Sequence, residues 1–161
     1  MACVRDRVVA LGMRSEEQED EFLKRLLTPE ETFEWGRGLG ESLEAGAVVA
    51  LCGDLGAGKT QASKGIVSGV GSGEVVSSPT FGLVHEYGEG RLPVFHFDWY
   101  RMESEVELLN MGWDDYLDEK GVVIVEWADR FPDLMPEGTR WFYFEHAGEE
   151  GRRVTEEGGV R

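Results

Sequence analysis

Residues 53–60 read Gly53-Asp54-Leu55-Gly56-Ala57-Gly58-Lys59-Thr60, which is the complete G-x-x-x-x-G-K-[ST] pattern of a phosphate-binding loop. The glycines let successive backbone N–H groups turn inward around phosphates, while the lysine reaches the β and γ oxygens and the threonine hydroxyl ligates Mg²⁺. The apolar run 47–51 leads into the loop, and apolar residues at helical spacing follow it in 62–70. This order of strand, loop and helix predicts a site for a nucleoside triphosphate and Mg²⁺.

The composition is that of a strongly acidic chain of 161 residues, a length that suits one domain with a single core. Lys and Arg total 16 against 32 Asp and Glu, so the formal net charge is −16. The arginines are scattered apart from the pair Arg152-Arg153. Because such a surface repels polyanions, the sequence disfavours extensive direct binding of tRNA or DNA and favours a basic partner protein.

Targeting signals are absent from the sequence. No apolar run approaches membrane-spanning length, and Arg5, Asp6 and Arg7 interrupt the stretch where a secretory signal needs an apolar core. Cys3 and Cys52 are the only cysteines, and they lack metal-ligand or C-x-x-C spacing. We therefore expect a cytoplasmic protein that does not associate with membranes and has no disulfide framework.

The chain is expected to divide into three parts. Residues 1–20 form an acidic extension whose charge density cannot support a core. Residues 21–146 form the phosphate-loop domain, and 147–161 form a mobile tail rich in Gly, Glu and Arg. The domain's first helix is predicted to start at Thr28 and Pro29, an N-cap hydroxyl followed by proline at the first helical position.

Strand signals fill the second half of the domain. Segments 81–87 and 94–99 are predicted to pair as an antiparallel hairpin. The run 122–125 is continuously apolar, which is typical of a central strand covered on both faces. A last strand is expected at 141–144. Together these elements predict an α/β fold, a three-layer P-loop NTPase-like domain with a mixed central sheet flanked by helices.

A phosphate loop needs a second acid near the metal, usually at the carboxyl end of a neighbouring strand. Asp98 ends one strand-like run and Glu126 ends another. Either carboxylate can hold Mg²⁺ directly or through water, or one of them can orient the attacking water. Position at a strand end does not choose between these roles, so both are predicted as catalytic and as metal-binding residues.

Other side chains beside these acids have both a functional and a structural interpretation. Arg101 and Arg130 can stabilise a transferring phosphoryl group, or they can form local ion pairs. His96 has no second ligand nearby, which favours a packed or hydrogen-bonded core histidine over a base. Trp127 can stack on a nucleotide or a partner, or it can simply fill space.

In combination, these stretches resemble the bacterial TsaE family, the small P-loop ATPase of tRNA threonylcarbamoyladenosine biosynthesis. The resemblance covers about residues 27–144 and consists of five motifs in the family's order. They are the loop 53–60, Ser78-Pro79-Thr80, His96-Phe97-Asp98-Trp99-Tyr100-Arg101, Gly112 with Asp115-Tyr116, and Val125-Glu126-Trp127.

The resemblance implies an ATPase that joins the TsaD-TsaB complex, which with TsaC installs threonylcarbamoyl on the adenosine beside the anticodon of certain tRNAs. ATP hydrolysis would sustain turnover of that complex, and contact with tRNA would be indirect. The implied cofactors are ATP and Mg²⁺.

The resemblance also implies roles for individual residues. Lys59 would contact phosphates, and Thr60 and Glu126 would hold Mg²⁺. Residues 28–32 would lie near the adenine. The remaining positions expected to be functionally sensitive are Thr80 and Asp98 as catalytic residues and Trp127 as a nucleotide-binding residue.

Other functions share the phosphate loop and its acids. A P-loop kinase would need an Arg-rich lid over the phosphates, and the sequence has no clustered Arg segment to supply one. A GTPase would need an N-K-x-D guanine motif, which does not follow the loop. A nucleotide-gated adaptor would use bound ATP to organise an interface, with hydrolysis incidental to it.

Overall fold

The computed structural model describes residues 23–26, 28–54, 56–77, 79, 84–146 and 151–157. The predicted extension 1–20 and the predicted site residues Leu55 and Thr80 lie outside these described residues. Their roles therefore stay predictions.

Seven strands in the described part of the chain form one mixed sheet in the order β1-β7-β6-β2-β5-β4-β3. Strand β2 pairs in parallel with β5 and β6, and β5 pairs in parallel with β4. Since these four inner strands run in one direction, their carboxyl ends meet at one edge of the sheet. The strands are β1 (Leu23–Leu26), β2 (Val48–Gly53), β3 (Val84–Tyr87), β4 (Val94–Asp98), β5 (Val122–Glu126), β6 (Arg140–His146) and β7 (Arg152–Glu156).

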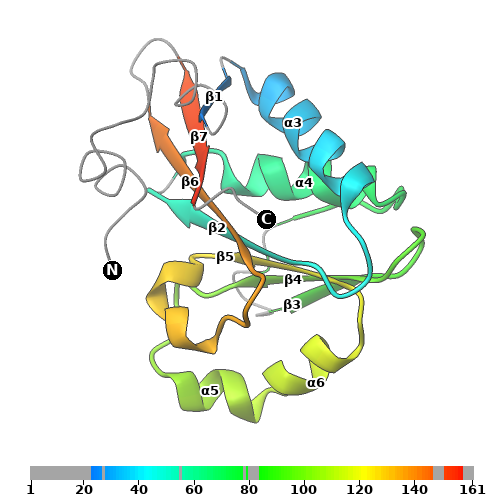
Figure 1. Ribbon diagram of the computed structural model, residues 1–161, viewed down its shortest axis with the longest axis vertical. Helices are drawn as coiled ribbons and strands as arrows, with labels where there is room; N and C mark the ends of the chain where they lie inside the picture. Colours follow the sequence, from blue (N-terminus) through cyan, green and yellow to red (C-terminus); the bar gives the residue numbers. More distant parts are fainter. Residues whose placement is uncertain are drawn as a thin grey trace.

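Helices cover both faces of the sheet and complete the predicted three-layer α/β fold (Figure 1). On one face lie α3 (Pro29–Ser42) and α4 (Lys59–Gly69), and on the other lie α5 (Glu105–Asn110) and α6 (Trp113–Asp118), with the 3₁₀ turns η1 (Ala128–Arg130) and η2 (Pro132–Leu134). Each face has its own apolar core, one containing Ile66 and the other Trp113. None of the helices in the described ranges is long and apolar enough to span a membrane.

Several predicted elements are confirmed. Helix α3 begins as expected, because the Thr28 side chain accepts a hydrogen bond from the Glu31 backbone N–H at 3.1 Å and Pro29 follows the cap. Strands β3 and β4 pair antiparallel as the predicted hairpin. Strand β5 is an inner strand whose residues are all buried, as its continuous apolar run predicts.

The glycines of α3 and α4 bring the two helix backbones into contact. A Cβ atom placed on Gly36 would lie 2.3 Å from the Ala62 carbonyl oxygen, and one on Gly65 would lie 2.1 Å from the Phe33 oxygen. Any side chain at these positions would force the helices apart. The contact fixes α4, and with it the phosphate loop that precedes it, against α3.

The prediction of a mobile tail over 147–161 is wrong for its central part. Residues Arg152–Glu156 form β7, which pairs antiparallel with β6 on one side and β1 on the other. Val154 is 2% exposed and joins the core. Because this strand is short and has a single apolar residue among charged ones, its sequence gives little strand signal. Strand β6 is consequently an inner strand and not the last one.

Candidate nucleotide site

The phosphate loop joins β2 to α4 at the carboxyl edge of the sheet. Gly53, Gly56 and Gly58 adopt φ values of 137°, 78° and 104°, a region that glycine enters without strain. At Gly53 a Cβ would also lie 2.3 Å from the Phe144 carbonyl oxygen on β6. Helix α4 starts at Lys59, immediately after the last glycine. At these three glycines, the backbone adopts the conformation that the glycine pattern of the loop requires.

Lys59 is almost completely buried inside this loop. Its Nζ donates hydrogen bonds to the backbone oxygens of Gly53 at 2.7 Å and Asp54 at 2.8 Å. The ammonium also lies 4.2 Å from the centroid of the Trp127 ring. Burial lowers the pKa of Lys59, and the negative charge of Glu126 opposes that shift. Since an ammonium has three donors, one N–H remains for a ligand.

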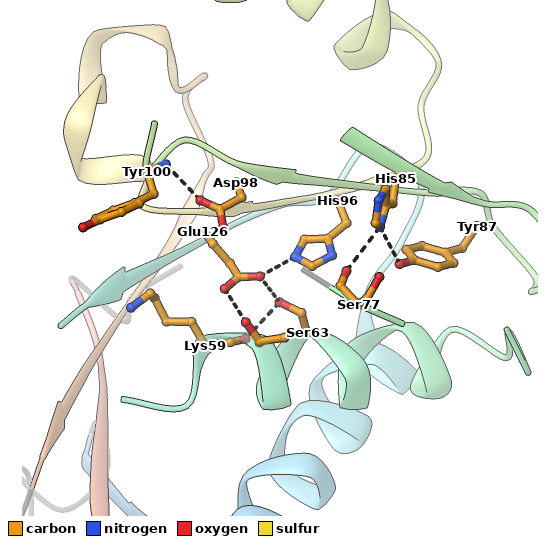
Figure 2. Close-up of polar contacts among 10 residues, drawn as sticks. Lys59, Ser63, Ser77, His85, Tyr87, His96, Asp98, Tyr100 and Glu126 are labelled. Carbon is orange, nitrogen blue, oxygen red and sulfur yellow. Dashed lines mark hydrogen bonds and ion pairs between the residues drawn. The ribbon is translucent and has the colours of Figure 1, made fainter. Parts of the chain in front are cut away.

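Glu126 ends β5 and is 2% exposed. Figure 2 shows its carboxylate between β4 and the first turn of α4. It accepts hydrogen bonds from the Thr60 hydroxyl at 3.0 Å and from His96 Nε2 at 2.5 Å, with a longer contact to the Ser63 hydroxyl at 3.5 Å. The acid at the strand end and the threonine of the phosphate loop are therefore in direct contact.

His96 has the hydrogen-bonded core position that the sequence favoured. Its ring is completely buried, and Nε2 must carry the proton because a carboxylate only accepts. Its Nδ1 has no hydrogen-bond partner among the described residues. The imidazole therefore holds the Glu126 carboxylate, a role that residue spacing does not reveal.

Asp98 ends β4 directly beside Glu126 in the parallel register. It is 7% exposed, and its Oδ1 accepts a hydrogen bond from the Tyr100 backbone N–H at 2.9 Å. The hydroxyl of Thr60 and the two carboxylates are oxygen ligands of the kind that Mg²⁺ prefers. No cluster of three or more His, Cys, Asp or Glu side chains in the described segments forms a metal cage. The oxygen chemistry of Thr60, Glu126 and Asp98 fits Mg²⁺, which proteins usually hold through one or two carboxylates together with substrate phosphates.

Trp127 follows Glu126 in a left-handed conformation with φ of 62°. Its backbone N–H donates to the Leu51 oxygen at 2.9 Å, and its ring lies against Tyr100 with centroids 4.8 Å apart. The turn places the indole over the Lys59 ammonium. The Trp127 ring therefore lies beside the phosphate loop, next to Lys59.

The two arginines near the acids lie in different surroundings. Arg130 donates hydrogen bonds to the backbone oxygens of Tyr100 at 2.6 Å and Met102 at 2.7 Å. These bonds stabilise the segment that follows β4. Arg101 is exposed.

A pocket of 510 Å³ adjoins the start of the loop, and its lining includes residues that sequence reasoning did not identify. Asp129 on η1 and Tyr143 and Glu145 on β6 join Gly53, Asp54 and Trp127 there. No motif marks the three added residues, because strands distant in sequence bring them together. Arg152, from the one pair of adjacent arginines in the sequence, lies outside this pocket lining and contacts the loop at the Gly56 backbone oxygen.

The chain is similar in sequence to known proteins of one family. The family model described as "Threonylcarbamoyl adenosine biosynthesis protein TsaE" matches residues 26–154. A Bacillus subtilis relative named "tRNA threonylcarbamoyladenosine biosynthesis protein TsaE" is 40% identical over 131 residues, which cover 81% of this chain and 82% of the relative. A Nostoc relative of the same name is 44% identical over 117 residues, 70% of this chain and 72% of its own.

A solved structure extends the similarity to three dimensions. The crystal structure of Bacillus subtilis YdiB matches with a TM-score of 0.72 and 34% identity, covering 83% of this chain and 82% of that one. The family match begins in β1 and ends in β7, so it includes every strand of the described sheet. On these matches, which span most of its length, the chain belongs to the TsaE family.

Proposed function

We propose that this chain binds ATP with Mg²⁺ at the phosphate loop, hydrolyses it, and acts with a TsaD-TsaB complex in the biosynthesis of tRNA threonylcarbamoyladenosine. Membership of the TsaE family and the names of the relatives support the pathway. The acidic surface supports a role in which tRNA is reached only through the partner complex.

One observation carries the ATPase proposal. The Thr60 hydroxyl of the phosphate loop and the Glu126 carboxylate from β5 are hydrogen-bonded at 3.0 Å. A hydroxyl and an acid in contact at the start of α4 are the two protein ligands that a P-loop NTPase offers to Mg²⁺. A glycine-rich turn without a ligand would need neither the buried lysine nor this pair.

Each residue would have a separate task. Backbone N–H groups of 56–58 and the Lys59 ammonium would hold the phosphates, and Thr60 with Glu126 would hold the metal. When bound, Mg²⁺ neutralises charge on the β- and γ-phosphate oxygens. Asp98, which lies beside Glu126 in the parallel register, would orient the attacking water.

The test is a calorimetric titration of the protein with ATP in the presence of Mg²⁺. We expect Lys59→Ala to weaken ATP binding about 10- to 100-fold, the loss expected when a charged hydrogen bond is removed. Lys64→Ala is the matched control, since it removes a lysine five residues further along α4. Equal ATP affinity in the Lys59 and Lys64 variants would reject the phosphate-loop assignment.

The two acids give a second readout in the same titration. Glu126→Gln should reduce the gain in ATP affinity that Mg²⁺ supplies, because the metal loses a charged ligand. Asp98→Asn should bind Mg²⁺-ATP nearly as tightly as the wild type and hydrolyse it more slowly. The reverse pattern would exchange the roles of the two carboxylates.

A further inference from the structure

Strand β7 brings the side chain of Arg152 against the phosphate loop. Its Nη2 donates a long hydrogen bond to the Gly56 backbone oxygen at 3.4 Å. A Cβ placed on Gly58 would lie 2.9 Å from the Arg152 Cδ and 3.2 Å from its Nε. The same Cβ would lie 3.5 Å from the Thr32 methyl group, so α3, the loop and β7 converge at this point.

The polar atoms of Arg152 are poorly satisfied. Its Nε is buried and has no hydrogen-bond partner among the described residues. Among the described residues, Arg152 makes one hydrogen bond, to Gly56, and no carboxylate lies within ion-pair distance of its guanidinium. By contrast, Arg140 pairs with Glu156 on β7 at 2.8 Å, and Arg37 pairs with Glu34 at 2.7 Å.

Among the described residues this guanidinium has no acidic partner, which is unexpected in a chain with 32 acidic residues. Arg152 is only partly buried, but a buried donor such as its Nε costs free energy when it has no partner, and an anion bound beside it would supply that partner. The planar fork of arginine matches phosphate oxygens, which it can contact with two hydrogen bonds. The place of Arg152, beside Gly56 and Gly58, identifies the anion as one held by the loop itself.

We propose that Arg152 is a nucleotide-binding residue whose guanidinium contacts phosphate oxygens of the nucleotide held by the loop 53–60. The inference rests on the proposed function. Lys59 contacts the backbone at Gly53 and Asp54, whereas Arg152 contacts it at Gly56 and beside Gly58. In this arrangement, Lys59 and Arg152 would contact the phosphates from two different parts of the loop.

The test compares Arg152→Met with Arg153→Met. Methionine keeps an unbranched stem to cover Gly58 but removes the guanidinium, and the Arg153 variant makes the same change at the next residue of β7. We expect Arg152→Met to weaken binding of ATP and of inorganic tripolyphosphate about 10- to 100-fold. Arg153→Met should stay within about 2-fold of the wild type, and Arg152→Lys should recover part of the affinity, because it restores the charge without the fork.

Salt dependence separates a phosphate contact from a mere support of the loop. If the guanidinium touches the anion, Arg152→Met should weaken the dependence of the ATP dissociation constant on KCl, because one screened attraction is lost. Arg153→Met should keep the wild-type dependence. Unchanged affinity for both ligands in Arg152→Met would overturn the inference, and so would weaker binding with the wild-type salt dependence.

The proposed function has a separate control. Lys59→Ala is titrated alongside under the same conditions. Binding that needs Lys59 and not Arg152 would reject the inference alone. Wild-type protein that shows no Lys59-dependent binding would reject the proposed function and the inference with it.

Discussion

His96 and Glu126 form a buried pair, and their contact explains the acid's fixed position. The exposed fraction is 0% for the His96 side chain and 3% for the Glu126 side chain, and the imidazole donates a hydrogen bond to the carboxylate at 2.5 Å. Removing the imidazole leaves the carboxylate with the Thr60 and Ser63 hydroxyls as its remaining donors. A buried acid that loses a partner is costly, because its desolvation is no longer compensated.

We expect His96→Ala to lower the free energy of unfolding by about 3–5 kcal/mol. Adding Glu126→Gln should restore part of this loss, since the double variant no longer buries an unpaired charge. The coupling free energy in the four-protein cycle, measured by urea denaturation without nucleotide, should be about 1–3 kcal/mol. Strictly additive losses would contradict a direct pair.

Burial also changes the pKa values of two side chains near the site, Cys52 on β2 and Tyr143 on β6. It raises the pKa of the Cys52 thiol and of the Tyr143 hydroxyl. In both cases the native protein keeps a proton that the unfolded chain loses at high pH. Their contribution to stability is therefore complete below the ordinary pKa values of about 8.5 for Cys and about 10 for Tyr, and it is lost as the pH rises above them.

Tyr143→Phe tests this alkaline dependence. Between pH 8 and pH 11 the free energy of unfolding of the wild type should fall more steeply than that of the variant, which has lost one of the two groups. The measurement is urea denaturation across that range. A steeper fall in the variant than in the wild type would contradict the direction of the Tyr143 shift.

At the scale of elements, the packing of α3 on α4 is the feature that sequence analysis could not supply. Strands β2, β4 and β5 are marked by apolar runs, and the start of α3 is marked by its cap, because these signals are local. The glycines of α3 weaken a helix when considered alone. Their use becomes visible only when the partner helix lies against them, as it does at Gly36 and Gly40.

Alanine substitutions along α3 measure this contact. A Cβ on Gly36 or Gly40 would lie 2.3 Å from a backbone oxygen of α4, so Gly36→Ala and Gly40→Ala should each lower the free energy of unfolding by about 1–3 kcal/mol or more. Gly38 has no atom within 4 Å of such a Cβ, and Gly38→Ala should raise it by about 0.5–1 kcal/mol. Thermal denaturation of the three variants measures these changes in stability. Equal changes at all three positions would contradict the helix contact.

At the scale of the whole molecule, prediction succeeded where a signal is local or follows from topology. The phosphate loop is a continuous pattern, and the rule for parallel sheets placed Asp98 and Glu126 at one edge. The pairing of His96 with Glu126 and the approach of Arg152 to the loop depend on strands far apart in sequence. Strand β7 was missed because Val154 is its only apolar residue, and its stability comes from pairing with β1 and β6.

We propose above that this protein is an ATPase coupled to a partner complex. The most direct measurement is ATP hydrolysis by the purified protein with Mg²⁺, with and without TsaD-TsaB and tRNA, beside the Lys59→Ala variant. We expect hydrolysis that requires Lys59 and rises when the partners are added. Tight ATP binding with no hydrolysis in the complete mixture would contradict it and would favour an adaptor that uses bound nucleotide only to organise its interface.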